Sequence, residues 1–176
     1  NRYRHTAVYD VAGDRMIMYG GLMASGTNND VWSLDMKTNV WTKLTTTGAI
    51  PAARARHNAI YDTQRNRMVV FGGLESSTPS DSLYALDLAT LEWSHLVPLG
   101  FLPEPRQAAA MIYQPDKDRL VLFGGNGQYD GELNDVWIYS FTNASWLQLN
   151  PTGTGPSPRF DVAASYDSLN NRLIVF

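Results

Sequence analysis

The sequence predicts an all-β fold built from one repeated unit of four short strands. The first observation is a repeat: an arginine recurs at Arg2, Arg54, Arg106 and Arg159, at intervals of about 52 residues in a chain of 176, and such self-similarity identifies repeat architectures. The second is that branched and aromatic residues stand between clusters of turn formers, as they do in strands. The third is that no stretch has a sustained helical period.

A polar turn joins the first two strands of each unit. In the second unit, segment 56–62 (RHNAIYD) leads through the turn residues DTQRN into segment 67–71 (RMVVF). A Gly–Gly pair then follows, at 20–21, 72–73 and 124–125 in successive copies. Glycine suits a place where the backbone approaches a neighbour closely or adopts a positive φ. We therefore expect each pair to mark a tight exit from the second strand.

Large aromatic side chains mark the third and fourth strands of each unit. The third strand carries Trp32, Tyr84 or Trp137, and the fourth carries Trp41, Trp93 or Trp146. Four antiparallel strands repeated at about 50 residues indicate a blade of a β-propeller. We expect the tryptophans to supply large buried area between neighbouring blades.

These units resemble the kelch repeats. The Gly–Gly pair, the spaced aromatics and the phrase G-x-x-P-x-x-R-x-x-H, as in 48–57, match the kelch pattern, including that of the galactose oxidase central domain, over essentially all 176 residues. The resemblance implies a kelch-type β-propeller with four-stranded blades around a central channel. It also implies that the first strand is innermost, and that the loops before the first strand and after the Gly–Gly pair share one face.

We expect three four-stranded blades and the first two strands of a fourth. The approximate repeats are 2–53, 54–105, 106–158 and the incomplete 159–176, which together make one partial propeller domain over 1–176. Closed propellers usually have about four to eight blades, and the kelch resemblance implies six or seven. We therefore predict that the remaining blades come from the same longer chain or from neighbouring chains.

Composition excludes several classes of function. With 14 basic and 17 acidic residues the net charge is −3, so the chain lacks the basic surface of a nucleic-acid binder. No apolar run approaches the roughly 18 residues that cross a bilayer. Without cysteine there is no thiolate metal site, and His5 and His57 are predicted to be hydrogen-bonded scaffold residues. We expect no metal, no cofactor and no membrane insertion; cytoplasmic and extracytoplasmic locations both stay open.

Candidate binding residues lie in the loops, where the copies differ. In the loop before the first strand, one repeat position holds Arg4, Arg56, Ala108 and Asp161. The kelch resemblance implies that this position presents arginine to a peptide carboxylate, which a guanidinium binds through two parallel hydrogen bonds. The alternative is a salt bridge from the arginine to a carboxylate of a neighbouring loop.

Loop aromatics extend this predicted surface. Tyr3 and Phe160 share one repeat position, Phe101 lies in a long loop, and Tyr129 and Asp130 lie in the loop 126–135, NGQYDGELND. Aromatic residues beside arginines are typical of protein interfaces, and the alternative is local packing against blade edges. The spacing of the loop oxygens is not that of an EF-hand, so we predict no calcium site there.

We predict a non-catalytic protein-interaction or scaffold module that binds a protein or peptide through its loop face. Two alternatives stay open. One is a carbohydrate-binding or carbohydrate-active propeller of a larger enzyme, and the other is a structural assembly module that uses its blade edges. Galactose oxidase has the same architecture, but its Cys–Tyr crosslink needs a cysteine that this chain lacks. Fold analogy alone does not decide function, and we predict no catalytic residue within these 176.

Overall fold

The computed structural model describes all 176 residues, and nearly all of its regular structure is β-strand. The first sheet has the order β1 (Thr6–Asp10), β2 (Arg15–Tyr19), β5 (Val31–Asp35) and β6 (Trp41–Leu44). The second has β9 (Asn58–Asp62), β10 (Arg67–Phe71), β13 (Leu83–Asp87) and β14 (Glu92–Leu96). The third has β16 (Ala110–Gln114), β17 (Arg119–Gly127), β18 (Glu132–Ser140) and β19 (Ser145–Leu149). The fourth has β20 (Ala164–Asp167) and β21 (Arg172–Val175).

Short strands complete the loops between these sheets. They are β3 (Leu22–Met23), β4 (Gly26–Thr27), β7 (Thr47–Gly48), β8 (Arg54–Ala55), β11 (Leu74–Glu75), β12 (Thr78–Pro79) and β15 (Arg106–Gln107). The single helical element is the short 3₁₀-helix η1 (Pro115–Lys117). None of the helical structure has the length and apolar character that crossing a bilayer requires.

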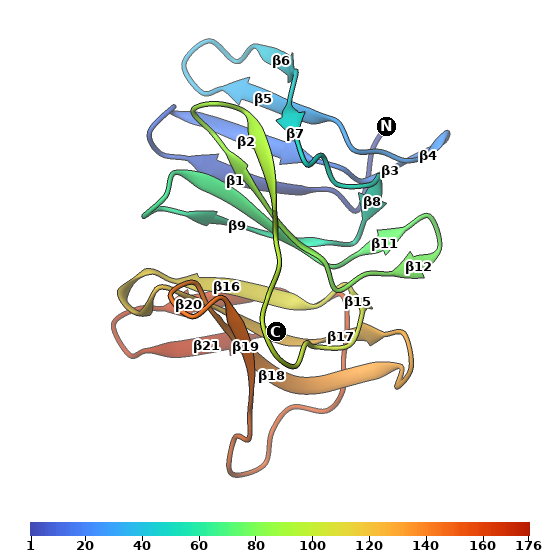
Figure 1. Cartoon of the computed structure of the whole chain (residues 1–176), viewed down its shortest axis with the longest axis vertical. Helices are drawn as coiled ribbons and strands as arrows, with labels where there is room; N and C mark the ends of the chain where they lie inside the picture. The colour runs from blue at the N-terminus through green and yellow to red at the C-terminus, as the bar shows by residue number, and fades with distance from the viewer.

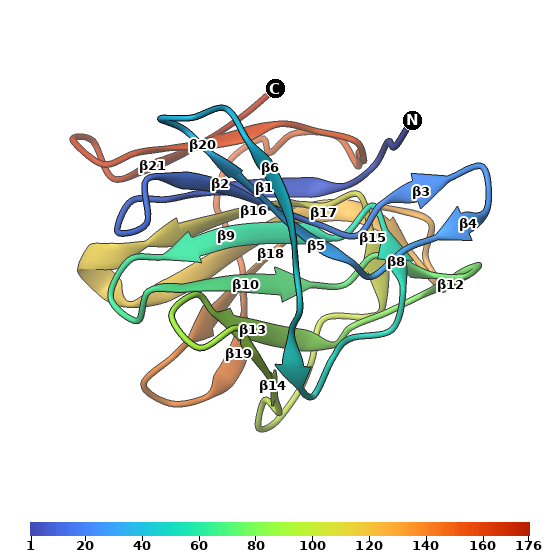
Figure 2. The ribbon, with the colours of Figure 1, turned by 90° about the horizontal axis from the view of Figure 1, so that it is seen from above.

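The sheets follow one another in chain order around an arc. The first strands contact each other in the order β1, β9, β16 and β20, and the first three sheets descend from blue to orange in Figure 1. Seen from above, the outer strands β14 and β19 lie on the opposite side of the molecule from β20 (Figure 2). The predicted all-β pattern of three four-stranded units and a two-stranded fourth is confirmed. The number of blades in a closed ring stays a prediction.

The two loop families meet on one face, as the kelch resemblance implies. Each loop before a first strand pairs with the loop after a Gly–Gly pair, through Tyr3 with Leu22, Ala55 with Leu74, and Gln107 with Asn126. These strands lie on the right-hand side of Figure 1. Part of the expected loop 126–135 is strand, because β17 and β18 continue past a register shift between Phe123 and Gly125.

Hydrophobic cores fill the spaces between neighbouring sheets. Strand β10 is buried on both faces, so its side chains alternate between two cores. Met68 and Val70 pack with the first sheet, whereas Val69 and Phe71 pack with the third. Three of the predicted tryptophans, Trp93, Trp137 and Trp146, lie in these cores. The Trp93 ring centroid is 5.0 Å from that of Tyr19, and that of Trp146 is 5.1 Å from that of Phe71.

Trp41 departs from the expected burial of the tryptophans. Its side chain is 45% exposed, although it occupies the same repeat position as Trp93. Trp93 lies against Tyr19 of the preceding sheet, whereas no sheet among the 176 residues precedes the one that contains Trp41. Burial of this repeat position therefore comes from the neighbouring sheet rather than from the blade itself.

The repeated arginine is part of the scaffold. Arg54 is fully buried, and its Nη1 donates to the carbonyl oxygen of Gly72 at 3.0 Å while its Nη2 donates to Glu75 at 2.7 Å. Arg106 donates in the same way to Gly124 at 2.9 Å and forms two bonds with Asp135, at 2.6 and 2.8 Å. Each arginine therefore ties the loop before a first strand to the Gly–Gly turn of its own blade.

Candidate functional site

Backbone hydrogen bonds join the four residues of the predicted arginine position, one from each copy, into a ladder on the loop face. The N–H of Arg56 donates to the carbonyl oxygen of Arg4 at 2.9 Å, that of Ala108 to Arg56 at 2.8 Å, and that of Asp161 to Ala108 at 2.9 Å. All four residues have φ between 53° and 57°, the left-handed region that non-glycine residues rarely occupy. Residues far apart in the sequence therefore stand side by side.

This ladder lines a shallow pocket of about 240 Å³, which we call the mouth. Its lining comprises Arg4, His5, Arg56, His57, Ala108, Ala109, Asp161 and Val162. These are two adjacent repeat positions from all four copies, so the pocket lies where the inner strands of the four sheets begin. The arc of sheets thus places a loop position that varies between the copies around one depression.

The two arginines of the mouth differ in how they are paired. Arg56 Nη2 lies 3.5 Å from Asp161 Oδ2, so the salt bridge considered as an alternative does form here. Asp161 is more than half exposed, and such a pair contributes only about 0–1 kcal/mol. Arg4 is exposed and makes no ion pair; its guanidinium lies 5.3 Å from the centre of the Tyr3 ring. The guanidinium of Arg4 thus has no ion-pair partner, and that of Arg56 has one weak ion pair.

An unsatisfied donor also lies beside the mouth. Arg56 Nε is shielded from solvent and has no hydrogen-bond partner. Buried donors without a partner are rare in folded proteins, and a charged donor gains more than a neutral one when an acceptor arrives. The electrostatics of the mouth therefore favour an anionic group.

His57 is a structural residue at this site. Its Nε2 and Thr6 Oγ1 lie 2.6 Å apart in a hydrogen bond, and its ring meets Tyr19 edge to face at 5.0 Å. Burial, with the positive charge of Arg54 as a second cause, lowers the pKa of His57 to about 3. The imidazole is therefore neutral at physiological pH. The more exposed His5 also has a lowered pKa, through partial burial and the charge of Arg2.

The remaining predicted residues lie at different distances from the mouth. Tyr3 and Phe160 directly precede Arg4 and Asp161 and are both exposed. Tyr129 and Asp130 are exposed in the tight turn between β17 and β18, on the same loop face but outside the lining of the mouth. The structure does not bring Phe101 to the mouth: it lines a separate groove beside β19.

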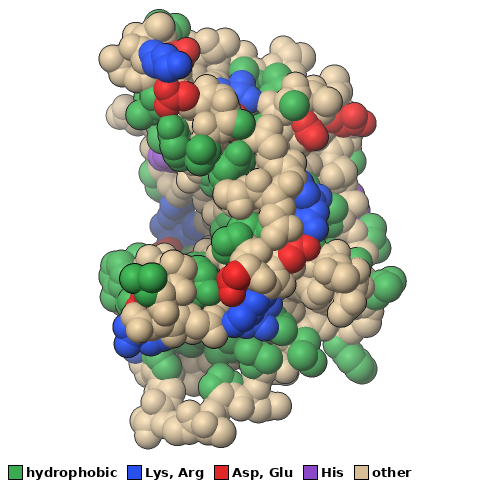
Figure 3. All heavy atoms as spheres, turned by 90° about the vertical axis from the view of Figure 1, so that its left-hand side faces the viewer, with side chains coloured by type: hydrophobic (Ala, Val, Ile, Leu, Met, Phe, Trp, Pro, Cys, Tyr) green, Lys and Arg blue, Asp and Glu red, His purple; other side chains and the backbone are tan.

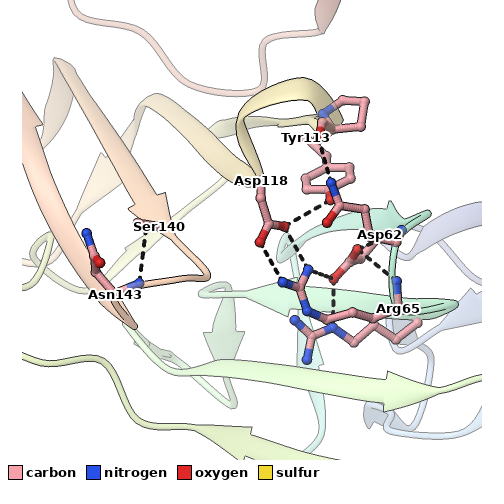
Figure 4. Close-up of polar contacts among 9 residues, drawn as sticks. Asp62, Arg65, Tyr113, Asp118, Ser140 and Asn143 are labelled. Atoms are coloured by element: carbon pink, nitrogen blue, oxygen red, sulfur yellow. Dashed lines mark hydrogen bonds and ion pairs between the residues drawn. The ribbon is translucent and has the colours of Figure 1, made fainter.

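Sequence reasoning missed an ion-pair network on the opposite face. Arg65 donates to both carboxylate oxygens of Asp118, at 2.7 and 2.5 Å, and to the buried Asp62 at 3.1 Å. Arg67 Nε donates to Asp62 at 2.8 Å, and the Tyr113 hydroxyl donates to Asp118 at 3.2 Å (Figure 4). This network joins the second sheet to the third. Acidic and basic side chains lie side by side across this face (Figure 3).

A signal for these contacts was present in the sequence. In three copies an aspartate stands five residues before an arginine and accepts from it at 2.8 Å: Asp10 with Arg15, Asp62 with Arg67, and Asp167 with Arg172. In the third copy Gln114 accepts from Arg119 at 2.6 Å. The spacing places both residues at the paired ends of the first two strands, so the repeat marks a structural contact.

Comparisons with known proteins match this chain to kelch-repeat proteins. A model of the KLHDC2/KLHL20/DRC7 Kelch-repeats domain matches residues 1–176. The chain is 32% identical to Kelch domain-containing protein 2 of Bos taurus, over 86% of the chain and 36% of that protein. It is 31% identical to Acyl-CoA-binding domain-containing protein 4 of Arabidopsis thaliana, over 93% and 25%. It is 30% identical to the Dynein alpha chain, flagellar outer arm, of Chlamydomonas reinhardtii, over 89% and 4%.

These relatives are much longer than the matched region. The chain spans about a third of the length of the bovine protein and less of the other two. The same repeats thus occur in proteins with very different names. Kelch-repeat domains are generally non-enzymatic and serve as protein-interaction modules.

Proposed function

The chain belongs to the kelch-repeat family, and from this premise we propose that it binds a protein or peptide partner at the mouth, through a carboxylate of that partner. The observation that carries the proposal is the pair of guanidinium groups lining one pocket, Arg4 without an ion pair and Arg56 with a weak one. We further propose that the chain is a non-catalytic part of a six- or seven-bladed ring.

The proposed recognition follows from the chemistry of the guanidinium. A carboxylate in the mouth accepts hydrogen bonds from Arg4 and displaces Asp161 from Arg56, a contact of 3.5 Å between partly exposed groups. Hydrogen bonds to charged groups contribute about 1.5–3 kcal/mol each, which exceeds the loss of that weak pair. Tyr3 precedes Arg4 and Phe160 precedes Asp161, so both aromatics can supply apolar contact area to the residues beside the carboxylate.

The backbone of the mouth is held in place before any partner arrives. The ladder from Arg4 to Asp161 ties four loops together, and the loop of Arg56 is anchored by the buried Arg54. A site that is already ordered loses less entropy when it binds. This rigidity supports a role in recognition rather than in a moving lid.

The proposal can be tested with a display library of random heptapeptides selected against the purified protein. We expect the selected peptides to carry a carboxylate and to bind Arg4→Ala and Arg56→Ala at least about tenfold more weakly. Arg56→Lys keeps the charge but loses the planar fork, so it should restore only part of the binding. Lys37→Ala changes an exposed lysine of the β5–β6 turn and serves as the control.

Two results would contradict this proposal. The mouth is not the binding site if the selected peptides lack a carboxylate. It is also not the binding site if the peptides bind both arginine variants as tightly as the parent protein. Thermal unfolding of each variant separates a lost contact from a lost fold, because Arg4 is exposed and Arg56 makes only one weak ion pair, so their removal should move the melting temperature little.

A further inference from the structure

One of the three links between consecutive sheets is apolar where the other two are not. The link from the second to the third sheet, 97–103, reads VPLGFLP, whereas 45–51 reads TTTGAIP and 150–156 reads NPTGTGP. In Figure 1 the apolar link runs down the front of the molecule between β14 and β15. The repeat pattern itself does not require these apolar residues, since the matching links do without them.

The apolar side chains of this link are open to solvent. Phe101 is 90% exposed, and Val97 and Leu99 are 68% and 65% exposed. Leu147 on the neighbouring strand β19 is 58% exposed, at the repeat position that Thr42 and Ser94 fill in the other blades. Single exposed apolar residues are ordinary, but a contiguous group of them marks an interaction site.

Between the link and β19 lies a groove of about 720 Å³, which we call the rim groove. Leu99, Phe101, Leu102 and Leu147 line it together with the buried Trp146, and its remaining lining includes no charged side chain. The polar part of the lining is limited to Asn143, Ser145 and Gln148, so a charged group that enters the groove loses hydration without gaining an opposite charge. The groove therefore selects uncharged, apolar side chains.

The backbone edge of β19 beside this groove is paired only at its first residue, Ser145, which forms a bridge with Leu99. In the second blade the link stays on the outer strand, where β7 pairs with Glu92 and Trp93 and the Ala49 N–H donates to the Trp93 carbonyl oxygen at 2.8 Å. In the third blade the contact ends at Leu99, whose N–H donates to Ala144 at 2.7 Å. Phe101 makes no corresponding bond to Trp146, so the link leaves the strand early.

The composition of β19 also sets it apart from the other outer strands. Outer strands of sheets commonly carry charges that discourage pairing with other chains. Strand β6 contains Lys43 and β14 contains Glu92, whereas β19 (Ser145–Leu149) contains no charged residue. An uncharged edge that is unpaired beyond Ser145 and lies next to an apolar groove has the features of a strand-docking site.

We propose that the rim groove binds an extended, uncharged, apolar segment of a partner protein, which pairs with the free edge of β19. The backbone of the segment would satisfy the edge groups of β19, and its alternate side chains would enter the groove beside Phe101 and Leu147. This site is distinct from the mouth in place and in chemistry. It selects neutral apolar sequences, whereas the mouth selects a carboxylate.

The test uses random octapeptides displayed against the Arg4→Ala/Arg56→Ala double variant, so that binding at the mouth does not contribute. We expect the selected peptides to be uncharged with alternating apolar residues. Their affinity should fall at least about tenfold for Leu147→Thr and for Phe101→Ser. Ile50→Thr, a partly exposed apolar residue in the matching link of the previous blade, is the control and should leave binding unchanged.

Chemical variants of the selected peptides separate strand pairing from simple hydrophobic contact. Methylation of alternate backbone nitrogens removes donors from one edge of an extended peptide, so it should abolish binding if the peptide pairs with β19. Equal binding of the methylated peptide overturns the strand-pairing proposal. The proposed site is wrong if the selected peptides bind Leu147→Thr and Phe101→Ser as tightly as the parent protein. It is also wrong if the selection yields no uncharged, apolar peptides.

Self-association is the competing occupant of the groove. Sedimentation of the double variant over a range of concentrations measures it directly. A dimer that dissociates in Leu147→Thr would assign the groove to a second copy of this chain and overturn the proposed partner segment. Because the substituted side chains are exposed, unfolding curves that match the parent protein confirm that each variant is folded.

Discussion

Arg54 and Arg56 lie two residues apart on one loop, yet their side chains have opposite surroundings. Arg54 is fully buried and donates to Gly72, Ser82 and Glu75. Arg56 faces the mouth and makes one ion pair of 3.5 Å with a half-exposed partner. The first side chain holds the blade together, whereas the second is available for a ligand.

The repeat pattern already distinguishes these two positions. The position of Arg54 is arginine in every copy, whereas that of Arg56 changes to Ala108 and Asp161 in the later copies. A residue that each blade needs for its own fold recurs in each blade, but a binding surface needs different groups at each point of its rim. Constancy thus indicates scaffold, and variation within one repeat position indicates a candidate site.

Substitution at Arg54 should give the largest effect on stability. Arg54→Ala leaves the Gly72 carbonyl oxygen, the Ser82 hydroxyl and the partly exposed Glu75 without their partner, and each buried group left unsatisfied costs about 1–3 kcal/mol. Arg56→Ala, the matched control, should cost no more than about 1 kcal/mol, because its one ion pair is long, at 3.5 Å, and its partner Asp161 is half-exposed. Urea unfolding measures both, and equal losses would abolish the distinction between scaffold and site.

The sequence predicted the scaffold better than the site, for a physical reason. Strands and Gly–Gly turns are local features that recur, so three copies read together reveal the fold. The mouth depends on a ladder that joins Arg4, Arg56, Ala108 and Asp161 across four blades, and no single copy contains it. Phe101 looked like part of the same surface, but the path of its link places it beside β19.

The network on the opposite face offers a second contrast with the mouth, through its dependence on pH. The hydrogen bond from Arg65 lowers the pKa of Asp118. Because the folded-state pKa is the lower one, this pair stabilises the fold fully above the unfolded pKa of about 4. The stabilisation is lost as the pH falls through the folded-state pKa.

Asp118→Asn should therefore lower the free energy of unfolding at pH 7 by about 1 kcal/mol, the range for pairs open to solvent. The difference from the parent protein should shrink as the pH falls below about 4. Urea unfolding at several pH values measures it, with Asp130→Asn as the control, because Asp130 is exposed and makes no ion pair. A difference that stays constant with pH would exclude the ionic pair as its source.

The smallest expected effect tests whether the mouth sacrifices stability for recognition. Arg4 has φ of 57° and is exposed, and the left-handed conformation costs a non-glycine residue roughly 1–2 kcal/mol. Glycine removes that cost but adds entropy to the unfolded chain, so Arg4→Gly should raise the free energy of unfolding by about 0.5–1 kcal/mol. The same change should weaken binding of the carboxylate peptides selected at the mouth. Arg4→Ala keeps the strain and loses the guanidinium, so it should weaken binding without raising stability. If Arg4→Gly is no more stable than Arg4→Ala, the ladder holds this residue without strain, and only the charge of Arg4 distinguishes its position from that of Ala108.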